Sequence, residues 1–267
     1  MIGHDVIAAA AERLGKASTR RQACAPVRDL LGETDIDAAY AVQMLLNDVR
    51  ITNGARVVGR KIGLTAPAVQ KQFGVARPDF GVLFDDMVVG DGDAIDMGRL
   101  IQPRVEGEIA FVLGAGLDNP SASVVDVLRA TEFLLPAIEV VDSRVAAWDI
   151  KITDTIADNA SSGMVVLGTT PISPRGLDLT EVALSLEHLG QSVSTGIGAA
   201  CLNSPVSAVA WLAREVSRRE QPLRAGDIVM SGALGPLVGV DAPGRYRADF
   251  SGLGHVEAVF ENHEGAA

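Results

Sequence analysis

The chain has 267 residues, of which 48% are hydrophobic, and a formal net charge of −11 at pH 7. This composition permits a large core in one main domain, and the negative charge provides no basic stripe, so nucleic acid and anionic membranes are excluded as expected partners. Residues 1–16 lack a secretory pattern, no apolar run reaches membrane-spanning length, and the only cysteines, Cys24 and Cys201, form no CxxC motif, so a reducing cytoplasm is expected.

The N-terminal part is expected to be helical. Asp5 is a candidate cap for a first helix that ends at Gly15, and Thr34 is a candidate cap for a second helix that ends at 53–54. Apolar residues recur at helical spacing in both segments, as Val6, Ile7, Ala10 and Leu14 and then as Val42, Leu45, Leu46 and Val49. We therefore expect residues 1–54 to form a helical part packed on a main body.

The rest of the chain is expected to be rich in strands. Short β-like runs separated by glycine span 55–62, 87–89, 105–113, 137–142 and 163–167. Helices are expected at 65–73, 123–133 and 204–218, and closing strands and turns at 226–235 and 246–260. The strands are too irregularly spaced for a doubly wound parallel sheet, so the predicted class is α+β, with residues 55–267 as a β-rich domain.

Two carboxylates, Glu106 and Glu108, stand on one face of the strand expected at 105–113. Because side chains on a strand alternate between faces, these acids point together while the residues between them point toward a core. A third acid, Glu139, interrupts the apolar run 134–141, where an ionised carboxylate is costly unless a cation or hydrogen-bond donors compensate it. The three acids together indicate a carboxylate metal site.

The ordinary alternative for a Glu-x-Glu pair is the solvated face of an antiparallel sheet. Glu139 lacks that explanation, because a lone acid inside an apolar stretch has no solvated face, so the metal interpretation is favoured. Three oxygen donors with no nearby histidine or thiolate suit a hard ion such as Mg²⁺ or Mn²⁺, which keeps water positions open for a chelating substrate.

Lys61 lies between Gly59 and Gly63 on one strand face, which leaves room for something to approach it. An isolated lysine of this kind is ordinarily a surface residue on an edge strand with glycine bulges. Beside an anion chelated by a metal, it would instead neutralise a substrate carboxylate, or relay protons if desolvation lowers its pKa.

Two polar segments are candidates for further chemistry. Residues 77–81 read as a turn in which Asp79 bonds local amides, with catalysis by Asp79 as an equal alternative. The stretch 151–163 follows the strand of Glu139 and is rich in hydroxyl and amide groups that can donate hydrogen bonds to a carboxylate. A solvated turn explains this stretch nearly as well.

Several other chemistries have no support in the sequence. The histidines are His4, His188, His255 and His263, and none of them stands beside a serine or cysteine in a nucleophile-like context, which argues against triad chemistry. The chain has no G-x-x-x-x-G-K-[ST] loop, and its two G-x-G segments lack the third glycine of a dinucleotide site. Nucleotide cofactors are therefore not expected.

Five segments in chain order resemble one known family. They are GRKIGLT at 59–65, PDFG at 78–81, QPRVEGEIAF at 102–111, PAIEVVDSR at 136–144 and ITDTIADNAS at 152–161. They resemble the 2-oxopent-4-enoate (2-hydroxypenta-2,4-dienoate) hydratases of the fumarylacetoacetate hydrolase superfamily. The resemblance runs along nearly the whole chain, and the glutamate and lysine motifs are its specific part.

By this resemblance, the fold is expected to be the fumarylacetoacetase C-terminal-like mixed β-roll with a helical N-terminal part, assembled as a homo-oligomer, a pentamer or a decamer. The resemblance implies Mg²⁺ or Mn²⁺ as the cofactor and a small anionic 2-oxo or 2-hydroxydienoate substrate. The residues it implies are, for the metal, Glu106, Glu108 and Glu139; for acid/base chemistry, Lys61 and Asp79; for the substrate carboxylate, Ser161 with Asn159 of the same loop.

The implied reaction adds water to 2-hydroxypenta-2,4-dienoate to give 4-hydroxy-2-oxopentanoate in meta-cleavage breakdown of aromatic compounds, with another pathway enzyme as an expected partner. A metal-dependent 4-oxalocrotonate decarboxylase is the nearest alternative, because chelation also stabilises the enolate left by loss of carbon dioxide. A carbon-carbon bond hydrolase is opposed by the small number of histidines. A noncatalytic binding protein with structural acids is the alternative from another class.

Overall fold

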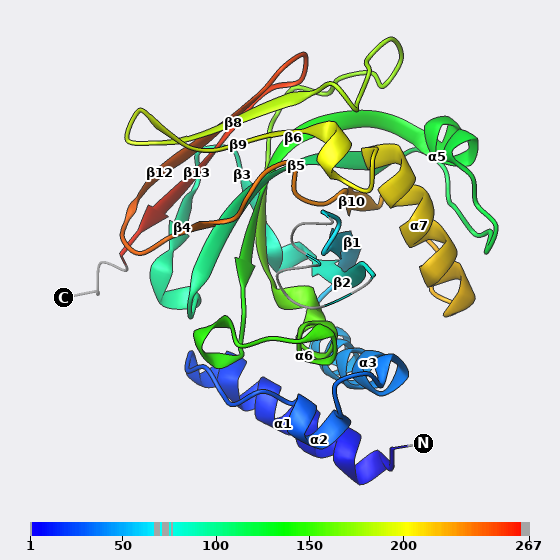
Figure 1. Cartoon of the computed structure of the whole chain (residues 1–267), viewed down its shortest axis with the longest axis vertical. Coiled ribbons are helices and arrows are strands. Elements are labelled where there is room, and N and C mark those ends of the chain that lie inside the picture. The colour runs from blue at the N-terminus through cyan, green and yellow to red at the C-terminus, as the bar shows by residue number, and fades with distance from the viewer. Residues whose placement is uncertain (1, 67–69, 71–74, 76, 263–267) are drawn as a thin grey trace.

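The computed structural model describes residues 2–66, 70, 75 and 77–262, so most of the helix expected at 65–73 lies outside the described residues. Figure 1 shows helices of the N-terminal part gathered at one end of a curled β body, with α5 (Val124–Ala130) and α7 (Pro205–Arg218) on its outer side. In the part of the chain that is described, no helix has the length and apolar character needed to cross a membrane. The mixed helix and sheet content agrees with the expected α+β class.

The N-terminal part contains α1 (His4–Arg20), α2 (Arg28–Leu31) and α3 (Ile36–Thr52). The predicted end of the first helix at Gly15 is wrong, because α1 continues until the left-handed Arg21 (φ 53°) caps it. The cap of α3 is Asp35, one residue after the predicted Thr34, and its carboxylate accepts from the backbone N–H of Ala38.

The strands form two sheets. Among the described residues, the larger sheet has the order β2 (Asp79–Phe84), β1 (Val57–Gly63), β10 (Ile228–Met230), β5 (Pro103–Leu113), β6 (Thr131–Asp142), β7 (Ser162–Leu167) and β3 (Val88–Gly90), with β11 (Val238–Gly239) also paired to β5. The smaller sheet has the order β4 (Ala94–Asp96), β13 (Gly254–Glu261), β12 (Gly244–Phe250), β8 (Ala183–His188) and β9 (Gln191–Ile197). Most pairings are antiparallel, as the rejection of a doubly wound sheet requires.

Three local predictions differ from the structure. The turn predicted at 77–81 is wrong from Asp79 onward, because β2 starts there and all of its residues are buried. The helix predicted at 123–133 ends at Ala130, where the β-branched and aromatic residues of β6 take over. The polar stretch 151–163 is not only loop, since it contains α6 (Ile152–Ala157) and the short 3-10 turn η4 (Asn159–Ser161).

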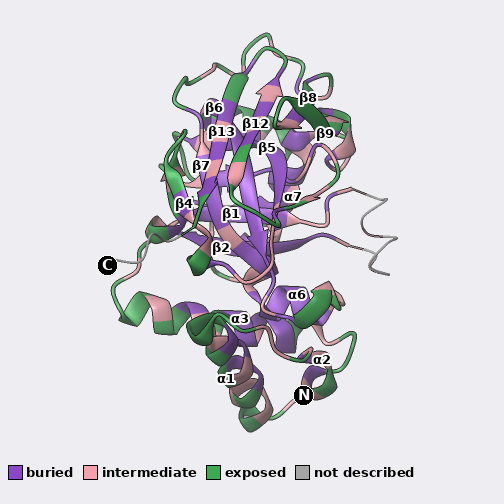
Figure 2. Ribbon diagram, turned by 90° about the vertical axis from the view of Figure 1, so that its left-hand side faces the viewer, coloured by how far each residue is buried: buried purple, intermediate pink, exposed green. Residues whose placement is uncertain are grey.

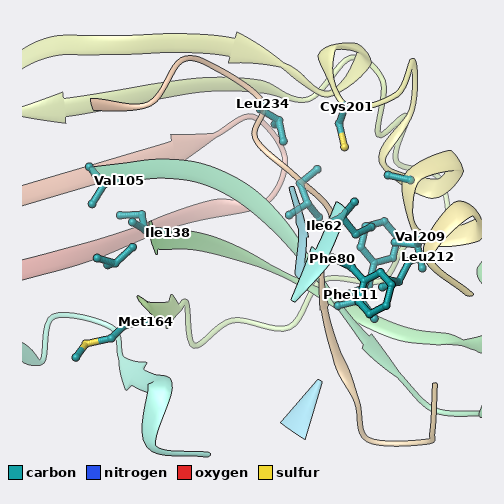
Figure 3. Close-up of a cluster of buried hydrophobic side chains, with 14 of the residues drawn as sticks. Ile62, Phe80, Val105, Phe111, Ile138, Met164, Cys201, Val209, Leu212 and Leu234 are labelled. Atoms are coloured by element: carbon teal, nitrogen blue, oxygen red, sulfur yellow. The ribbon is translucent and has the colours of Figure 1, made fainter. Parts of the chain in front are cut away.

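The core lies between the two sheets and continues under the helices. Figure 3 shows Val105 and Ile138 on neighbouring strands of the larger sheet, pointing into this core. Both residues are fully buried, and each directly precedes a glutamate on the opposite face of its strand. The apolar packing therefore fixes which way Glu106 and Glu139 project.

The N-terminal helices are fastened to the body by buried polar groups. Asp154 of α6 is fully buried and accepts hydrogen bonds from the backbone N–H groups of Val27 and Arg28, both at 2.8 Å, and from the Arg28 guanidinium at 2.7 Å. Gln43 of α3 donates to the carbonyl oxygens of Phe80 and Ile156 at 2.9 and 2.8 Å. Figure 2 shows buried residues continuing from the strands into α3 and α6. The separate units 1–54 and 55–267 stay a prediction, because one buried cluster includes side chains of both.

Replacing Asp154 with alanine should lower the free energy of unfolding by about 3–5 kcal/mol, because the buried Arg28 guanidinium and two backbone N–H groups lose their acceptor. Asp149→Ala is the matched control: Asp149 also pairs with Arg28, but its side chain is 62% exposed, and its loss should cost less than about 1 kcal/mol. Urea denaturation of both variants checks this, and similar midpoints would contradict the assigned role of Asp154.

Candidate metal centre and active site

Three glutamates converge on one point of the larger sheet. Glu106 of β5 and Glu139 of β6 are direct partners in the antiparallel register, and Glu108 lies two residues along β5 on the same face. One carboxylate oxygen from each lies within 4.8 Å of the others. Glu108 and Glu139 are fully buried, and Glu106 is 6% exposed. The structure thus brings together the three metal ligands that the sequence predicts.

The carboxylates of this trio are poorly compensated by the described protein groups. Glu108 Oε2 accepts from the backbone N–H of Gly232 at 2.8 Å, but its Oε1 has no hydrogen-bond partner, and neither has either oxygen of Glu139. Burial, followed by the charge of Glu139, raises the pKa of Glu106 to about 7. Burial and the two neighbouring carboxylates raise the pKa of Glu108 well above its usual value. Unpartnered buried oxygens of this kind fit a divalent cation, which would hold all three groups ionised.

Lys61 of β1 faces the same point. It pairs with Met230 of β10, which in turn pairs with Ala110 of β5, and Ala110 lies on the face of Glu106 and Glu108. The ammonium lies 3.1 Å from Glu139 Oε1 as an ion pair, although its direction does not satisfy hydrogen-bond geometry. Burial lowers the pKa of Lys61, but Glu139 and the other nearby carboxylates outweigh it, so the net shift is upward. With 2% exposure, the surface-lysine alternative is wrong.

The glycines beside Lys61 do not leave open space, as the sequence suggested, because the protein itself fills it. A Cβ at Gly59 would lie 1.9 Å from the Ile228 carbonyl oxygen, and a Cβ at Gly63 would lie 2.2 Å from Asp79 Oδ1. Gly63 is the register partner of Asp79, so its missing side chain lets this carboxylate lie beside Lys61. Asp79 Oδ2 accepts from the Thr155 hydroxyl at 2.9 Å, whereas Oδ1 has no partner. Burial raises the pKa of Asp79, and Lys61 opposes that shift.

The loop η4 carries Ser161 to the site and holds Asn159 away from it. Asn159, Ala160 and Ser161 have consecutive left-handed backbone angles, with φ of 53°, 51° and 53°, and such strain concentrates at functional sites. Ser161 lines the cavity that also contains Lys61 and Asp79. The Asn159 amide instead bonds the backbone of Val82, accepting at 2.8 Å and donating at 2.9 Å. Asn159 therefore fastens η4 to β2, and the geometry gives no support to its expected substrate contact.

The same cavity is lined by residues that the sequence analysis did not single out. Thr155 orients Asp79, and Arg104 lies two residues before Glu106 on the same face of β5. Alternation along β5 could have identified Arg104. The pairing of Thr155 with Asp79 joins segments 76 residues apart and has no sequence signal.

The fold and this site define the class of protein. Residues 55–261 match the model of the fumarylacetoacetate (FAA) hydrolase C-terminal family, and the chain belongs to this family. Within it, the chain is 51% identical over 255 residues to a 2-keto-4-pentenoate hydratase of Paraburkholderia xenovorans (strain LB400), covering 96% of this chain and 95% of the relative. It is 41% identical over 251 residues to a 2-hydroxyhexa-2,4-dienoate hydratase of Comamonas testosteroni, covering 93% and 95%.

A solved structure extends the likeness. The 4-oxalocrotonate decarboxylase from Pseudomonas putida G7, complexed with magnesium and adipate, aligns with a TM-score of 0.93 and 32% identity over 98% of this chain and 99% of that chain. The helical N-terminal part is therefore shared with this relative, together with the β body. That structure contains magnesium, which agrees with the donor set found here.

Divalent-metal binding should strengthen as the pH rises through about 7. A metal needs ionised carboxylates, and below the raised pKa of Glu106, about 7, protons compete for the site. We expect the Mn²⁺ dissociation constant to be about tenfold weaker at about pH 6 than at about pH 8, with protons released on binding. Calorimetry in two buffers of different ionisation enthalpy measures both quantities.

Glu139→Gln should abolish this binding, whereas Glu132→Gln, an exposed glutamate on the same strand, should leave it unchanged. Binding of Mn²⁺ that is equally strong in the Glu139→Gln variant, or independent of pH, would exclude the trio as the metal site.

Proposed function

We propose that the chain is a divalent-metal-dependent hydro-lyase that adds water to 2-hydroxypenta-2,4-dienoate and forms 4-hydroxy-2-oxopentanoate. The observation that carries the proposal is the buried trio Glu106, Glu108 and Glu139 with Lys61 in ion-pair contact. It stands in a chain about half identical, over nearly its whole length, to relatives named as 2-keto-4-pentenoate hydratases. Such relatives place the reaction in the breakdown of aromatic compounds.

The metal in this proposal is Mg²⁺ or Mn²⁺, held by the three glutamates. Oxygen-only donors favour these hard ions. When bound, the ion would withdraw charge from the carboxylate and the C2 oxygen of the substrate.

The protein's own groups then handle the protons. Lys61 is buried among carboxylates that keep it protonated, so we assign it as the acid that protonates the far carbon when the dienol becomes a ketone. Asp79 has one oxygen held by Thr155 and the other without a partner, so we assign Oδ1 as the base for the water that adds at C4. Ser161, at the wall of the cavity, would donate to the substrate carboxylate.

A metal-dependent 4-oxalocrotonate decarboxylase is the second candidate, favoured by the TM-score of 0.93 to a decarboxylase structure. The glutamate trio serves both reactions, because each passes through an enolate next to the carboxylate. The higher identity to hydratases, 51% against 32%, favours water addition.

The test of the function is to supply the Mn²⁺-loaded protein with freshly made 2-hydroxypenta-2,4-dienoate and, separately, with 4-oxalocrotonate. We expect 4-hydroxy-2-oxopentanoate, with incorporation of labelled oxygen from water, and no faster release of carbon dioxide than in the blank. Carbon dioxide release from 4-oxalocrotonate without hydration of the dienol would replace the proposal with the decarboxylase.

Gly63→Ala should lower kcat by about a hundredfold without unfolding the protein, since the new Cβ would displace Asp79 Oδ1 from its place beside Lys61. Gly15→Ala is the control, because its Cβ would meet only Leu46 Cδ2 at 3.6 Å. Lys61→Ala should lose turnover while Mn²⁺ still binds. Near-normal turnover in either site variant, measured by loss of the dienol absorbance, would remove the acid/base pair from the mechanism.

Assembly and location belong to the same proposal. We take the protein to be a cytoplasmic homo-oligomer, a pentamer or a decamer, that associates with another enzyme of its pathway. Three apolar side chains on the short helix α5, those of Val124, Val125 and Leu128, are 44–48% exposed, which supports a subunit contact on that side.

A further inference from the structure

The site lacks the positive charge that an anionic substrate needs. With the acids ionised, the glutamate trio and Asp79 carry four negative charges, while a divalent cation and Lys61 supply three positive ones. Even if Asp79 is protonated, the total is only neutral. A substrate carboxylate that enters this buried site would therefore add an uncompensated charge, which a low-dielectric environment penalises.

Arg104 is placed to supply that charge. It precedes Glu106 by two residues on β5, so alternation directs both side chains to one face of the sheet. Arg104 and Glu106 line the same cavity as Lys61 and Ser161. Among the described residues, Arg104 and Lys61 are the only cationic side chains in that lining.

The Arg104 guanidinium is oriented but has no anionic partner of its own. Its Cζ lies 4.4 Å from the centroid of the Trp148 ring, and the Trp148 indole N–H is fixed by donating to the Gln102 carbonyl oxygen at 3.1 Å. Within the described part of the chain, the guanidinium takes part in no hydrogen bond and no ion pair, and Asp241 acts on it only as a more distant charge. A stacked, half-buried arginine with free donors is suited to bind a carboxylate in bidentate geometry.

We propose that Arg104, held flat by Trp148, binds the C1 carboxylate of the substrate and thereby selects for a free 2-oxo acid head. The inference rests on the proposed function in taking the substrate to be a 2-oxo or 2-hydroxydienoate anion. Arg104 supplies the charge and the bidentate contact, and Ser161 adds a neutral donor. The reacting end of the chain then points away from Arg104 toward Lys61 and Asp79.

The first test is kinetic. Arg104→Gln should raise KM for the dienoate by about tenfold to a hundredfold, the size of a lost charge-assisted hydrogen bond, with kcat changed by less than about threefold. Arg104→Lys should recover only part of the loss, because an ammonium lacks the planar fork. Arg99→Gln is the control with the same change of charge, since Arg99 is exposed and lies outside this cavity.

The second test does not depend on turnover. Calorimetry of the Mn²⁺-loaded protein measures the affinities of pyruvate, the smallest 2-oxo carboxylate, and of methyl pyruvate, which has lost that charge. Arg104→Gln should reduce the preference for pyruvate over its ester by about tenfold or more, while Mn²⁺ affinity stays the same. Trp148→Leu should reduce this preference by a smaller factor, because the guanidinium keeps its charge but loses its platform.

These measurements separate the two proposals. If the wild-type protein fails to hydrate the dienol but Arg104→Gln still loses its preference for pyruvate, the carboxylate role of Arg104 stands and the hydratase assignment falls. If hydration is observed and a folded Arg104→Gln variant binds pyruvate as tightly as the wild type, the role of Arg104 is refuted.

Discussion

The structure is organised around two like charges that face each other across neighbouring strands. Glu106 and Glu139 occupy directly opposed positions on β5 and β6, in an environment with almost no water and few donors. Opposed carboxylates destabilise a sheet unless a cation lies between them. The nearby Lys61 ammonium offsets part of this repulsion, and a divalent ion would offset the rest, so the cost of the pair in the protein alone is the basis of its affinity for metal.

The helical N-terminal part contributes to the site without entering it. Asp154 connects α6 to α2, and Gln43 connects α3 to both β2 and α6. Those same elements carry Asp79, at the start of β2, and Thr155, within α6. The strained turn η4 follows α6 directly, so helices distant from the metal ligands determine where the loop with Ser161 lies.

Much of the site could be predicted because it follows from periodicity. Alternation put Glu106 and Glu108 on one face, and the apolar neighbours of Glu139 identified it as a buried acid in need of compensation. The register that opposes Glu106 to Glu139 could not be derived, since strand pairing depends on the whole sheet. Composition was misleading at 77–81, where turn-forming residues precede a fully buried strand whose register with β1 overrides their local preference. The same limit applies to Asn159, whose amide was available to a ligand by sequence and is used by β2 in the fold.

The strict alternation along β1 has a consequence for how such chains can vary in length. Lys61 faces the carboxylates, while its neighbour Arg60 lines a separate groove beside α3. Inserting or deleting one residue within 57–63 would exchange these two cations and direct the wrong one at the site. The same argument holds for β5, where a shift by one position would turn Glu106 and Glu108 into the hydrophobic interior. Evolutionary changes in length are therefore confined to connections such as 114–122, at the far end of β5, where the backbone is free of this constraint.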